Sequence, residues 1–316
     1  MFRKVLVPLD GSPFAERALS FAEALAKRGG GQVLLVNAAS ATVLPGIESS
    51  SAQVKAVQEG KSYLADVAGR LKEQGIEVET AVPYGSPSDA IVTEIEVRNA
   101  DLVLMATHGR SGLGRWVYGS VAEAVLHSSP VPVMLVQSWQ GEAPWRDFLS
   151  HPRLLVPLDG SVFGEAAVGP AANLAREIGG ELILMQAISL AESVVRTEGG
   201  GILAPAVPIG EKLGEYEENA RAYLHGVAQR VNAEFGVEAR LEIGFGEPTE
   251  TIASVAQQLQ ATLVVMSTHG RTGMARAVFG SVAAGVLRTA IAPLLLVRPT
   301  GITAAAQQLA TTATAG

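Results

Sequence analysis

The chain has no cysteine in its 316 residues, which excludes disulfides, thiolate catalysis and cysteine-based zinc sites. It also has no long run of Lys or Arg, and its formal charge is −7, so nucleic acid is not expected to be its main partner. No apolar run approaches the roughly 20 residues of a membrane helix. The start, MFRKVLVPLD, lacks the features of a signal peptide. These absences predict a cytoplasmic protein with no membrane partner.

What the chain does contain is enough apolar sequence for real cores. Apolar residues make up 48% of it and charged residues 17%, as is typical of a globular rather than a disordered chain. Because domains usually span about 100–200 residues, this length predicts two domains.

The sequence is internally duplicated. MATHGRSGLGRWVYGS (Met105–Ser120) returns as MSTHGRTGMARAVFGS (Met266–Ser281), and VLVPLDGS (Val5–Ser12) returns as LLVPLDGS (Leu154–Ser161). An insertion in the second copy includes RTEGGGILAPAVPIGEKLG, whose Gly and Pro content predicts a longer loop. We therefore expect a first domain over 1–138, a linker over 139–152, a second domain over 153–299 and a flexible tail over 300–316.

Each copy alternates short apolar runs with helical patterns. The first copy offers five strands, KVLVPL, GQVLLVNA, VETAVPYG, DLVLMATH and PVMLVQ. Helices are expected over 13–30, with Phe14, Ala18, Phe21 and Leu25 on the apolar face, and over 49–75. Alternation of this kind predicts an α/β fold: two tandem Rossmann-like domains, each an open five-stranded parallel sheet flanked by helices.

The repeated motifs fall where such sheets bind ligands, just past the carboxyl ends of the strands at which the strand order reverses. The first strand leads into Asp10, and the fourth leads through Gly109 to a helix that begins near Gly119 and Ser120. Glycines allow close approach to a ligand, and a helix N-terminus attracts phosphate. An aspartate here can accept hydrogen bonds from ribose hydroxyls. This arrangement favours a mononucleotide, and it recurs in the second copy.

The motif is neither of the common phosphate-binding loops. The chain has no GxxxxGK[ST], and GLGRWVYG and GFGEPT both lack the third glycine of the dinucleotide fingerprint. No lysine lies in the loop, so Arg110, Arg115, Arg271 and Arg276 are the cations available to phosphate.

These residues resemble the universal stress protein family. Its nucleotide-binding members carry Gly, two residues, Gly, nine residues and then Gly-Ser or Gly-Thr. Gly109 and Gly270 are each followed by nine residues and a Gly-Ser pair, and Val-Pro-x-Asp-Gly-Ser matches in both copies. The resemblance covers the chain apart from the linker and tail. One departure is that Ala106 and Ser267 replace the first motif glycine.

The resemblance implies ATP or a related adenine nucleotide as ligand, with magnesium bridging its phosphates as an open option. It places adenine against Pro8, Ala38 and Met105, and phosphates on the backbone N–H groups of the glycines and the helix start. The implied binding residues of the first copy are Pro8, Asp10, Ala38, Met105, Ala106, Gly109, Gly119, Ser120 and Val121. Those of the second are Pro157, Asp159, Ala187, Met266, Ser267, Gly270, Gly280, Ser281 and Val282.

Structural roles compete with these assignments. Asp10 and Asp159 would also organise the turn into the first helix, and Ser120 and Ser281 would serve as ordinary helix caps. His108 and His269 are interpreted as loop anchors rather than catalytic groups.

Three functions stay open: a nucleotide-dependent stress-response regulator, a structural or interaction stress protein that binds no nucleotide, and a slow ATP hydrolase. No nucleophile–base arrangement or metal site is evident, so we predict that the chain is not primarily an enzyme. The family also dimerises through its last strands. We expect an internal pseudo-dimer through Pro132–Gln137 and Ala292–Pro299, with a homodimer as a further option.

Overall fold

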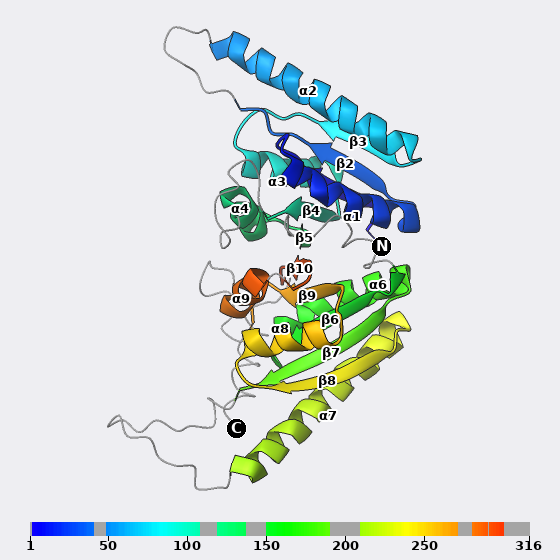
Figure 1. Cartoon of the computed structure of the whole chain (residues 1–316), viewed down its shortest axis with the longest axis vertical. Helices are drawn as coiled ribbons and strands as arrows, with labels where there is room; N and C mark the ends of the chain where they lie inside the picture. Colours follow the sequence, from blue (N-terminus) through cyan, green and yellow to red (C-terminus); the bar gives the residue numbers. More distant parts are fainter. Residues whose placement is uncertain are drawn as a thin grey trace, which may run out of the picture. The chain divides into compact units, whose positions relative to one another are not determined.

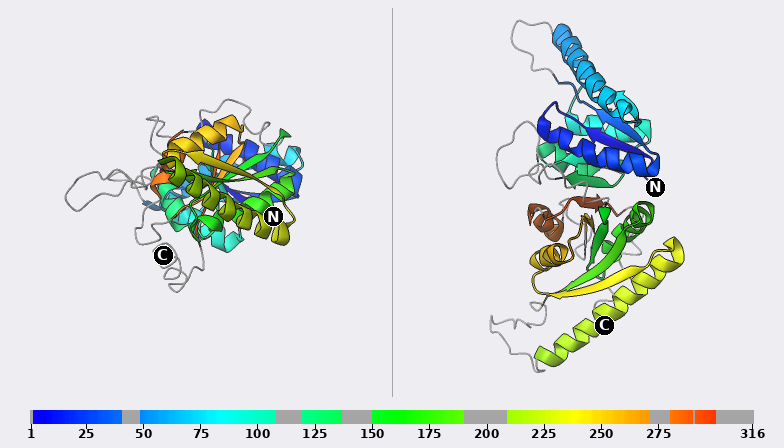
Figure 2. Two further views of the ribbon diagram at one scale, coloured as in Figure 1. Left: turned by 90° about the horizontal axis from the view of Figure 1, so that it is seen from below. Right: turned by 45° about the vertical axis from the view of Figure 1, so that its right-hand side comes forward.

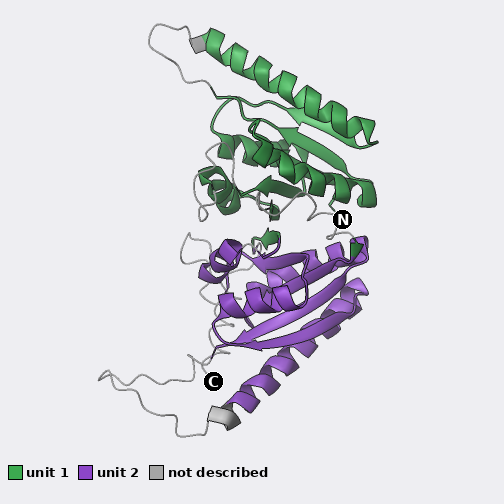
Figure 3. Cartoon of the chain, in the orientation of Figure 1, with its two compact units in different colours: residues 1–150, 293–298 green, residues 151–292, 299–316 purple. Residues whose placement is uncertain are grey.

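The computed structural model describes residues 2–40, 49–107, 119–136, 150–189, 209–270, 280–289 and 291–299. The chain divides into two compact units (Figure 3). The N-terminal unit comprises Met1–Ser150 and Pro293–Arg298, and the C-terminal unit comprises His151–Ala292 and Pro299–Gly316. The strand near the end of the chain thus belongs by its contacts to the first unit, which the sequence boundaries at 138 and 153 do not anticipate.

The N-terminal unit alternates strands and helices as the sequence predicts (Figure 1). Its elements are β1 Lys4–Pro8, α1 Pro13–Gly29, β2 Gln32–Val36, α2 Ser49–Glu73, β3 Glu77–Ala81, α3 Pro87–Arg98, β4 Leu102–Ala106, α4 Ser120–Ser128, β5 Val133–Val136 and β10 Leu294–Val297.

The first five strands form a parallel sheet in the order β3-β2-β1-β4-β5. Because crossovers between parallel strands are right-handed, α1 and α2 lie on one face of the sheet and α3 and α4 on the other (Figure 1). The strand order reverses between β1 and β4, so their carboxyl ends open a crevice. β10 extends the sheet as an antiparallel strand on β5, with Leu294 opposite Leu135.

The C-terminal unit repeats this plan. Its elements are β6 Arg153–Leu158, the 3-10 turn η1 Gly164–Ala167, α6 Val168–Ile178, β7 Glu181–Ile188, α7 Ile209–Phe235, β8 Ala239–Phe245, α8 Pro248–Gln258, β9 Leu263–Ser267 and α9 Ser281–Thr289. Its strands are parallel in the order β9-β6-β7-β8, with the reversal between β6 and β9. Figure 2 shows α7 running along β8.

The inserted segment is shorter as a loop than the sequence predicts. Its last six residues, IGEKLG, already belong to α7, which begins at Ile209. The rest of the expected loop lies outside the described residues, as do most of the expected linker and the tail.

Helix α1 shows how local sequence sets an element. Ser12 caps it by accepting the Ala15 amide proton at 3.2 Å, Pro13 occupies the first turn, and Gly30 ends it in the left-handed conformation at φ 63°. Phe21 and Leu25 are buried as predicted. Phe14 is not, because it lies at the first turn, where it is 39% exposed and stacks under the Arg17 guanidinium.

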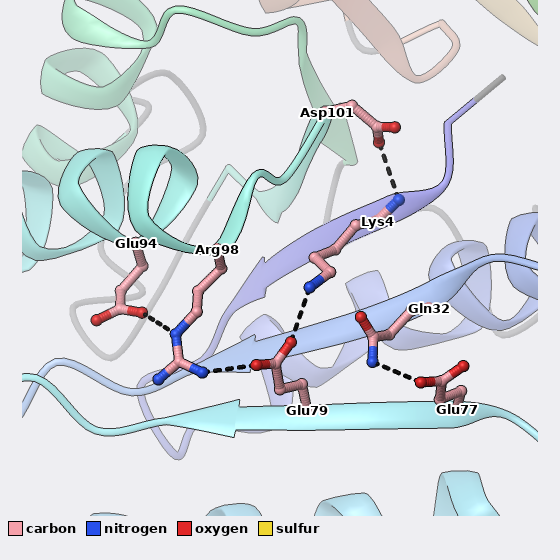
Figure 4. A network of polar contacts seen from close by, with 7 residues as sticks. All are labelled: Lys4, Gln32, Glu77, Glu79, Glu94, Arg98 and Asp101. Carbon is pink, nitrogen blue, oxygen red and sulfur yellow. Dashed lines mark hydrogen bonds and ion pairs between the residues drawn. The ribbon is translucent and has the colours of Figure 1, made fainter.

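A polar network ties together strands and α3 of the N-terminal unit (Figure 4). Glu79 pairs with Lys4 at 2.9 Å and with Arg98 at 2.6 Å. These cations hold the pKa of Glu79 below its usual value, chiefly through the hydrogen bond from Lys4. Asp101 accepts the amide protons of Arg3 and Lys4 at 2.7 and 3.1 Å, which fixes the start of β1.

Candidate functional site

A crevice of about 310 Å³ opens at the carboxyl ends of β1 and β4. All of the first-copy residues that the sequence assigned to the site and that the structure describes lie in its wall. They are Pro8, Asp10, Ala38, Met105, Ala106, Gly119, Ser120 and Val121. Residues as far apart in the sequence as Pro8 and Val121 thus meet around one cavity, because parallel strands bring their carboxyl ends to the same edge of the sheet.

Sequence reasoning missed part of the wall. The additional lining residues are Leu9, Ala15, Val36, Pro87, Ile91, Thr107 and Ala122. Pro87 and Ile91 lie in the first turn and a half of α3 and add an apolar side to the crevice. The signal is present in the sequence, since YGSPSDAI and FGEPTETI place Pro and Ile at matched positions of the two copies.

The aspartate at the end of β1 holds a tight turn. Asp10 accepts the Ser12 amide proton at 2.9 Å across Gly11, which has a φ of 82°. Asp159 makes the same contact with the Ser161 amide at 3.0 Å across Gly160, at φ 83°. The structural role of both aspartates is therefore present in the fold, and for Asp10 it coexists with a position in the crevice wall.

The start of α4 forms the other side of the crevice. Gly119, at φ −60° and ψ 152°, takes the N-cap position, and Ser120 is the first helical residue rather than a cap. The Gly119 amide donates to the Thr107 carbonyl at 3.1 Å, and the Gly280 amide donates to Thr268 at 3.0 Å. Each amide thus closes the loop before its helix, and phosphate binding by these two amides, which would require that bond to be exchanged, stays a prediction. The N–H groups of the first helical turn, beginning at Ser120, have no partner within the helix and remain the donors for an anion.

Several predicted residues lie outside the part of the chain that the structure describes. They are Gly109, His108, Arg110, Arg115, Arg271 and Arg276.

In the C-terminal unit the equivalent residues occupy equivalent elements. Pro157 lies in β6, Ala187 in β7, Met266 and Ser267 end β9, and Ser281 and Val282 begin α9 after Gly280. The Asp159 carboxylate lies against Gly164 and Gly270: a Cβ at either glycine would come within 2.5 Å of a carboxylate oxygen.

Residues at the end of β9 form hydrogen bonds with one another. Ser267, in the place of the first motif glycine, is buried, and its hydroxyl accepts the His269 amide proton at 3.3 Å. The His269 ring contacts the Thr268 hydroxyl at 2.9 Å, which agrees with its interpretation as a loop anchor. His127, His151 and His225 are exposed, as expected of surface residues.

A tyrosine of the long helix lies close to the aspartate turn in each unit. Burial raises the pKa of Tyr63, and the Glu16 and Asp10 carboxylates add to the effect. Burial likewise raises the pKa of Tyr223, with contributions from Glu165 and Asp159. Both phenols therefore stay protonated at neutral pH, within electrostatic reach of the two aspartates.

No three His, Asp or Glu side chains gather as a metal site within the described ranges. None of the helices described there is both long and apolar enough to span a bilayer.

Comparison with known proteins identifies the class to which this fold and crevice belong. The model of the universal stress protein family matches twice, over residues 1–137 and 151–298. The chain belongs to the universal stress protein family and carries two of its domains in tandem.

Relatives of similar length support this organisation. The chain is 26% identical to universal stress protein E of Escherichia coli K12 over 95% of both chains. It is 28% identical to the universal stress protein E homolog of Haemophilus influenzae over 71% of both. Its fold is similar to that of a universal stress protein from Archaeoglobus fulgidus, with a TM-score of 0.73 and 22% identity, covering 94% of this chain and 99% of that one.

Proposed function

We propose that this universal stress protein binds ATP or a related adenine nucleotide and acts as a nucleotide-dependent regulator in the stress response. The observation that carries the proposal is the 310 Å³ crevice, whose wall contains every described residue of the expected first-copy site. Its volume lies in the range of small-molecule sites.

Each part of the crevice suits one part of a nucleotide. Pro8, Ala38 and Met105 offer an apolar wall for the base, and Ile91 and Pro87 enlarge it. Asp10 has a carboxylate that can accept hydrogen bonds from ribose hydroxyls. The first turn of α4 presents amide N–H groups, and a partial positive charge, to the phosphates.

Magnesium would reach this site with the phosphates, since it binds proteins through one or two carboxylates together with substrate oxygens. Asp10 is the acidic side chain in the described wall of the crevice. The ion would supply charge neutralisation for the phosphates.

A second candidate is an interaction protein that binds no nucleotide. It is favoured by Ala106 and Ser267, which stand where the family's nucleotide-binding members have glycine, and by the buried Ser267 hydroxyl bonded to the His269 backbone. The cytoplasmic location and a homodimer stay proposals. So does the pairing of the two domains through their last strands, which is supported by the antiparallel register of β10 on β5.

Titration calorimetry of ATP into the full chain tests the function. Gly119→Val is expected to abolish the tightest binding site, because a Cβ at position 119 meets no described atom within 4 Å and Gly119 lines the crevice, so the new side chain would take up space there.

Gly69→Val is the matched control. Gly69 lies in α2 of the same unit, and its Cβ would also meet nothing within 4 Å. The control should bind as the wild type does. Equal ATP affinity in the wild type and Gly119→Val, or no binding by the wild type, contradicts the proposal.

A further inference from the structure

The segments that begin with the two aspartates, DGSPFAE and DGSVFGE, differ at Pro13 and Val162 and at one small buried residue. Three positions after the serine of each turn, the N-terminal unit has Ala15 and the C-terminal unit has Gly164. Both are buried, and both follow a serine whose hydroxyl accepts their amide proton, at 3.2 Å for Ala15 and 3.0 Å for Gly164. The backbone contact is thus shared, and at this position the two units differ by one methyl group.

Glycine at 164 lets the Asp159 carboxylate occupy space that a side chain would take. The Oδ1 atom lies 2.5 Å from the position of a Cβ at 164, closer than real Cβ atoms approach an oxygen. Ser161 holds the same oxygen by its amide at 3.0 Å and by its hydroxyl at 2.6 Å. With alanine at this position, the carboxylate would have to turn away.

The second oxygen of the same carboxylate lies against Gly270. Asp159 Oδ2 lies 2.5 Å from the position of a Cβ at Gly270, the glycine that was expected to approach the phosphates. A carboxylate here fills the space above the glycine and repels an anionic ligand. In this arrangement the carboxylate therefore occupies a place that the ligand needs.

The N-terminal unit carries the methyl group of Ala15 at this position. There Asp10 accepts the Ser12 amide proton at 2.9 Å. Asp10 and Ala15 both line the open 310 Å³ crevice.

We propose that the identity of this residue, Ala15 or Gly164, sets the nucleotide affinity of each unit. Gly164 allows Asp159 to close over Gly270, so the C-terminal unit binds an adenine nucleotide only after that carboxylate turns away. The N-terminal unit is then the tighter site. This inference rests on the proposed nucleotide binding and assigns that binding to the two units unequally.

The test is calorimetric titration of the full chain with ATP, in which Gly119→Val identifies the heat that belongs to the N-terminal site. The wild type is expected to show a second site at least about tenfold weaker than the first. Gly164→Ala should tighten the second site by about tenfold and leave the first unchanged.

The reciprocal variant is Ala15→Gly, which is expected to weaken the first site and leave the second as it was. It tests the same idea in the other unit if Gly164→Ala does not fold. A crystal structure of Gly164→Ala should show the Asp159 carboxylate turned away from Gly270.

Two equal sites in the wild type overturn this inference while leaving nucleotide binding intact. So does an unchanged second site in folded Gly164→Ala, or an unchanged first site in Ala15→Gly. Absence of ATP binding in the wild type and both variants overturns the proposed function, and the inference with it.

Discussion

In the N-terminal unit, Glu16 of α1 accepts a hydrogen bond from the Tyr63 hydroxyl at 3.0 Å and pairs with Arg70 at 2.6 Å. Tyr63 and Arg70 lie seven residues apart, on one face of α2. This cluster joins the long helix to the helix that follows the aspartate turn.

The C-terminal unit keeps all three residue types. Glu165 pairs with Arg230 at 2.7 Å, and Tyr223 lies seven residues before Arg230 on α7. The Tyr223 hydroxyl is buried and makes no hydrogen bond to any residue the structure describes, although Glu165 helps to raise its pKa. The cluster therefore recurs with one contact loosened.

A second cluster was rebuilt rather than kept. Glu79, the centre of the network in the N-terminal unit, corresponds to Arg240 in the C-terminal unit. There the central anion is Glu181, which lies 3.6 Å from Arg153 and 3.8 Å from Arg240.

The comparison separates two kinds of polar contact. The network around Glu79 needs only balanced charge, so its central anion can lie on β3 in one unit and on β7 in the other. The cluster around Glu16 adjoins Ala15 in the crevice wall, so a change there would move the helix that carries part of the site. Two experiments test this distinction and a third compares one backbone position of the two units, in order from the largest expected effect to the smallest.

The largest effect is expected at the retained cluster. Glu16→Ala should lower the free energy of unfolding by about 2 kcal/mol, because it leaves the Tyr63 hydroxyl and Arg70 without their acceptor. Glu165→Ala should lower the free energy of unfolding by about 1 kcal/mol, because of the two contacts that Glu16 makes, Glu165 keeps only the pair with an arginine, Arg230. Thermal unfolding of the full chain by calorimetry measures both.

The control for this pair is Glu59→Ala, which removes an exposed pair with Lys55 on α2 and should change the unfolding free energy by less than about 0.5 kcal/mol. Equal losses for Glu16→Ala and Glu165→Ala would show that the loosened contact in the C-terminal unit makes no difference.

The network around Glu79 predicts that the stability of the N-terminal unit depends on pH. Because the pKa of Glu79 is lowered in the folded state, its stabilising contribution is present above the unfolded value of about 4.3 and is lost as the pH falls through the folded value. Glu79→Gln should therefore be less stable than the wild type at pH 7, by about 0.5 kcal/mol from the lost Lys4 pair, and the difference should shrink below pH 4.

Urea unfolding at a series of pH values measures that difference. Glu77→Gln, at an exposed site in the same strand, should follow the wild type throughout. A gap between wild type and Glu79→Gln that widens in acid would contradict the assigned direction of the pKa shift.

The smallest effect concerns a residue just past α3 in one unit and just past α8 in the other. Asn99 and Gln260 are equivalent and both adopt the left-handed conformation, at φ 53° and 50°. Asparagine tolerates this conformation better than glutamine. Gln260→Asn should raise the unfolding free energy by about 0.5 kcal/mol, and Asn99→Gln should lower it by a similar amount. Thermal melts showing the same sign for both variants would refute this explanation.

Much of the fold could be predicted from hydrophobic periodicity and from the residues that begin and end helices. The helix predicted over 13–30 is observed over Pro13–Gly29, because Ser12, Pro13 and Gly30 mark its ends locally. Phe14 was predicted to be buried and is exposed, because a side chain in the first turn of a helix can extend beyond the elements that would cover it. The six helical residues at the start of α7 were read as loop because glycines outweighed their weak periodicity.

The crevice residues at the strand ends could be predicted from the sequence, whereas those that neighbouring helices add to its wall could not. The positions of Asp10 and Ser120 follow from repeated motifs and parallel topology. The contribution of Ile91 depends on how α3 packs, which no local pattern states. The bonds from the Gly119 and Gly280 amides depend on loop closure, and the contrast between Ala15 and Gly164 has meaning only once Asp159 is located.

The pairing of β10 with β5 bears on synthesis at the ribosome. Five strands of the N-terminal unit leave the ribosome first, whereas residues 293–298 are made only after residues 151–292. Until they emerge, the backbone groups along one side of β5 lack the neighbour they have in the finished fold and are open to association with other nascent chains. A chain interrupted anywhere between 151 and 292 would carry that exposed edge permanently, so premature termination within the second domain harms the first domain.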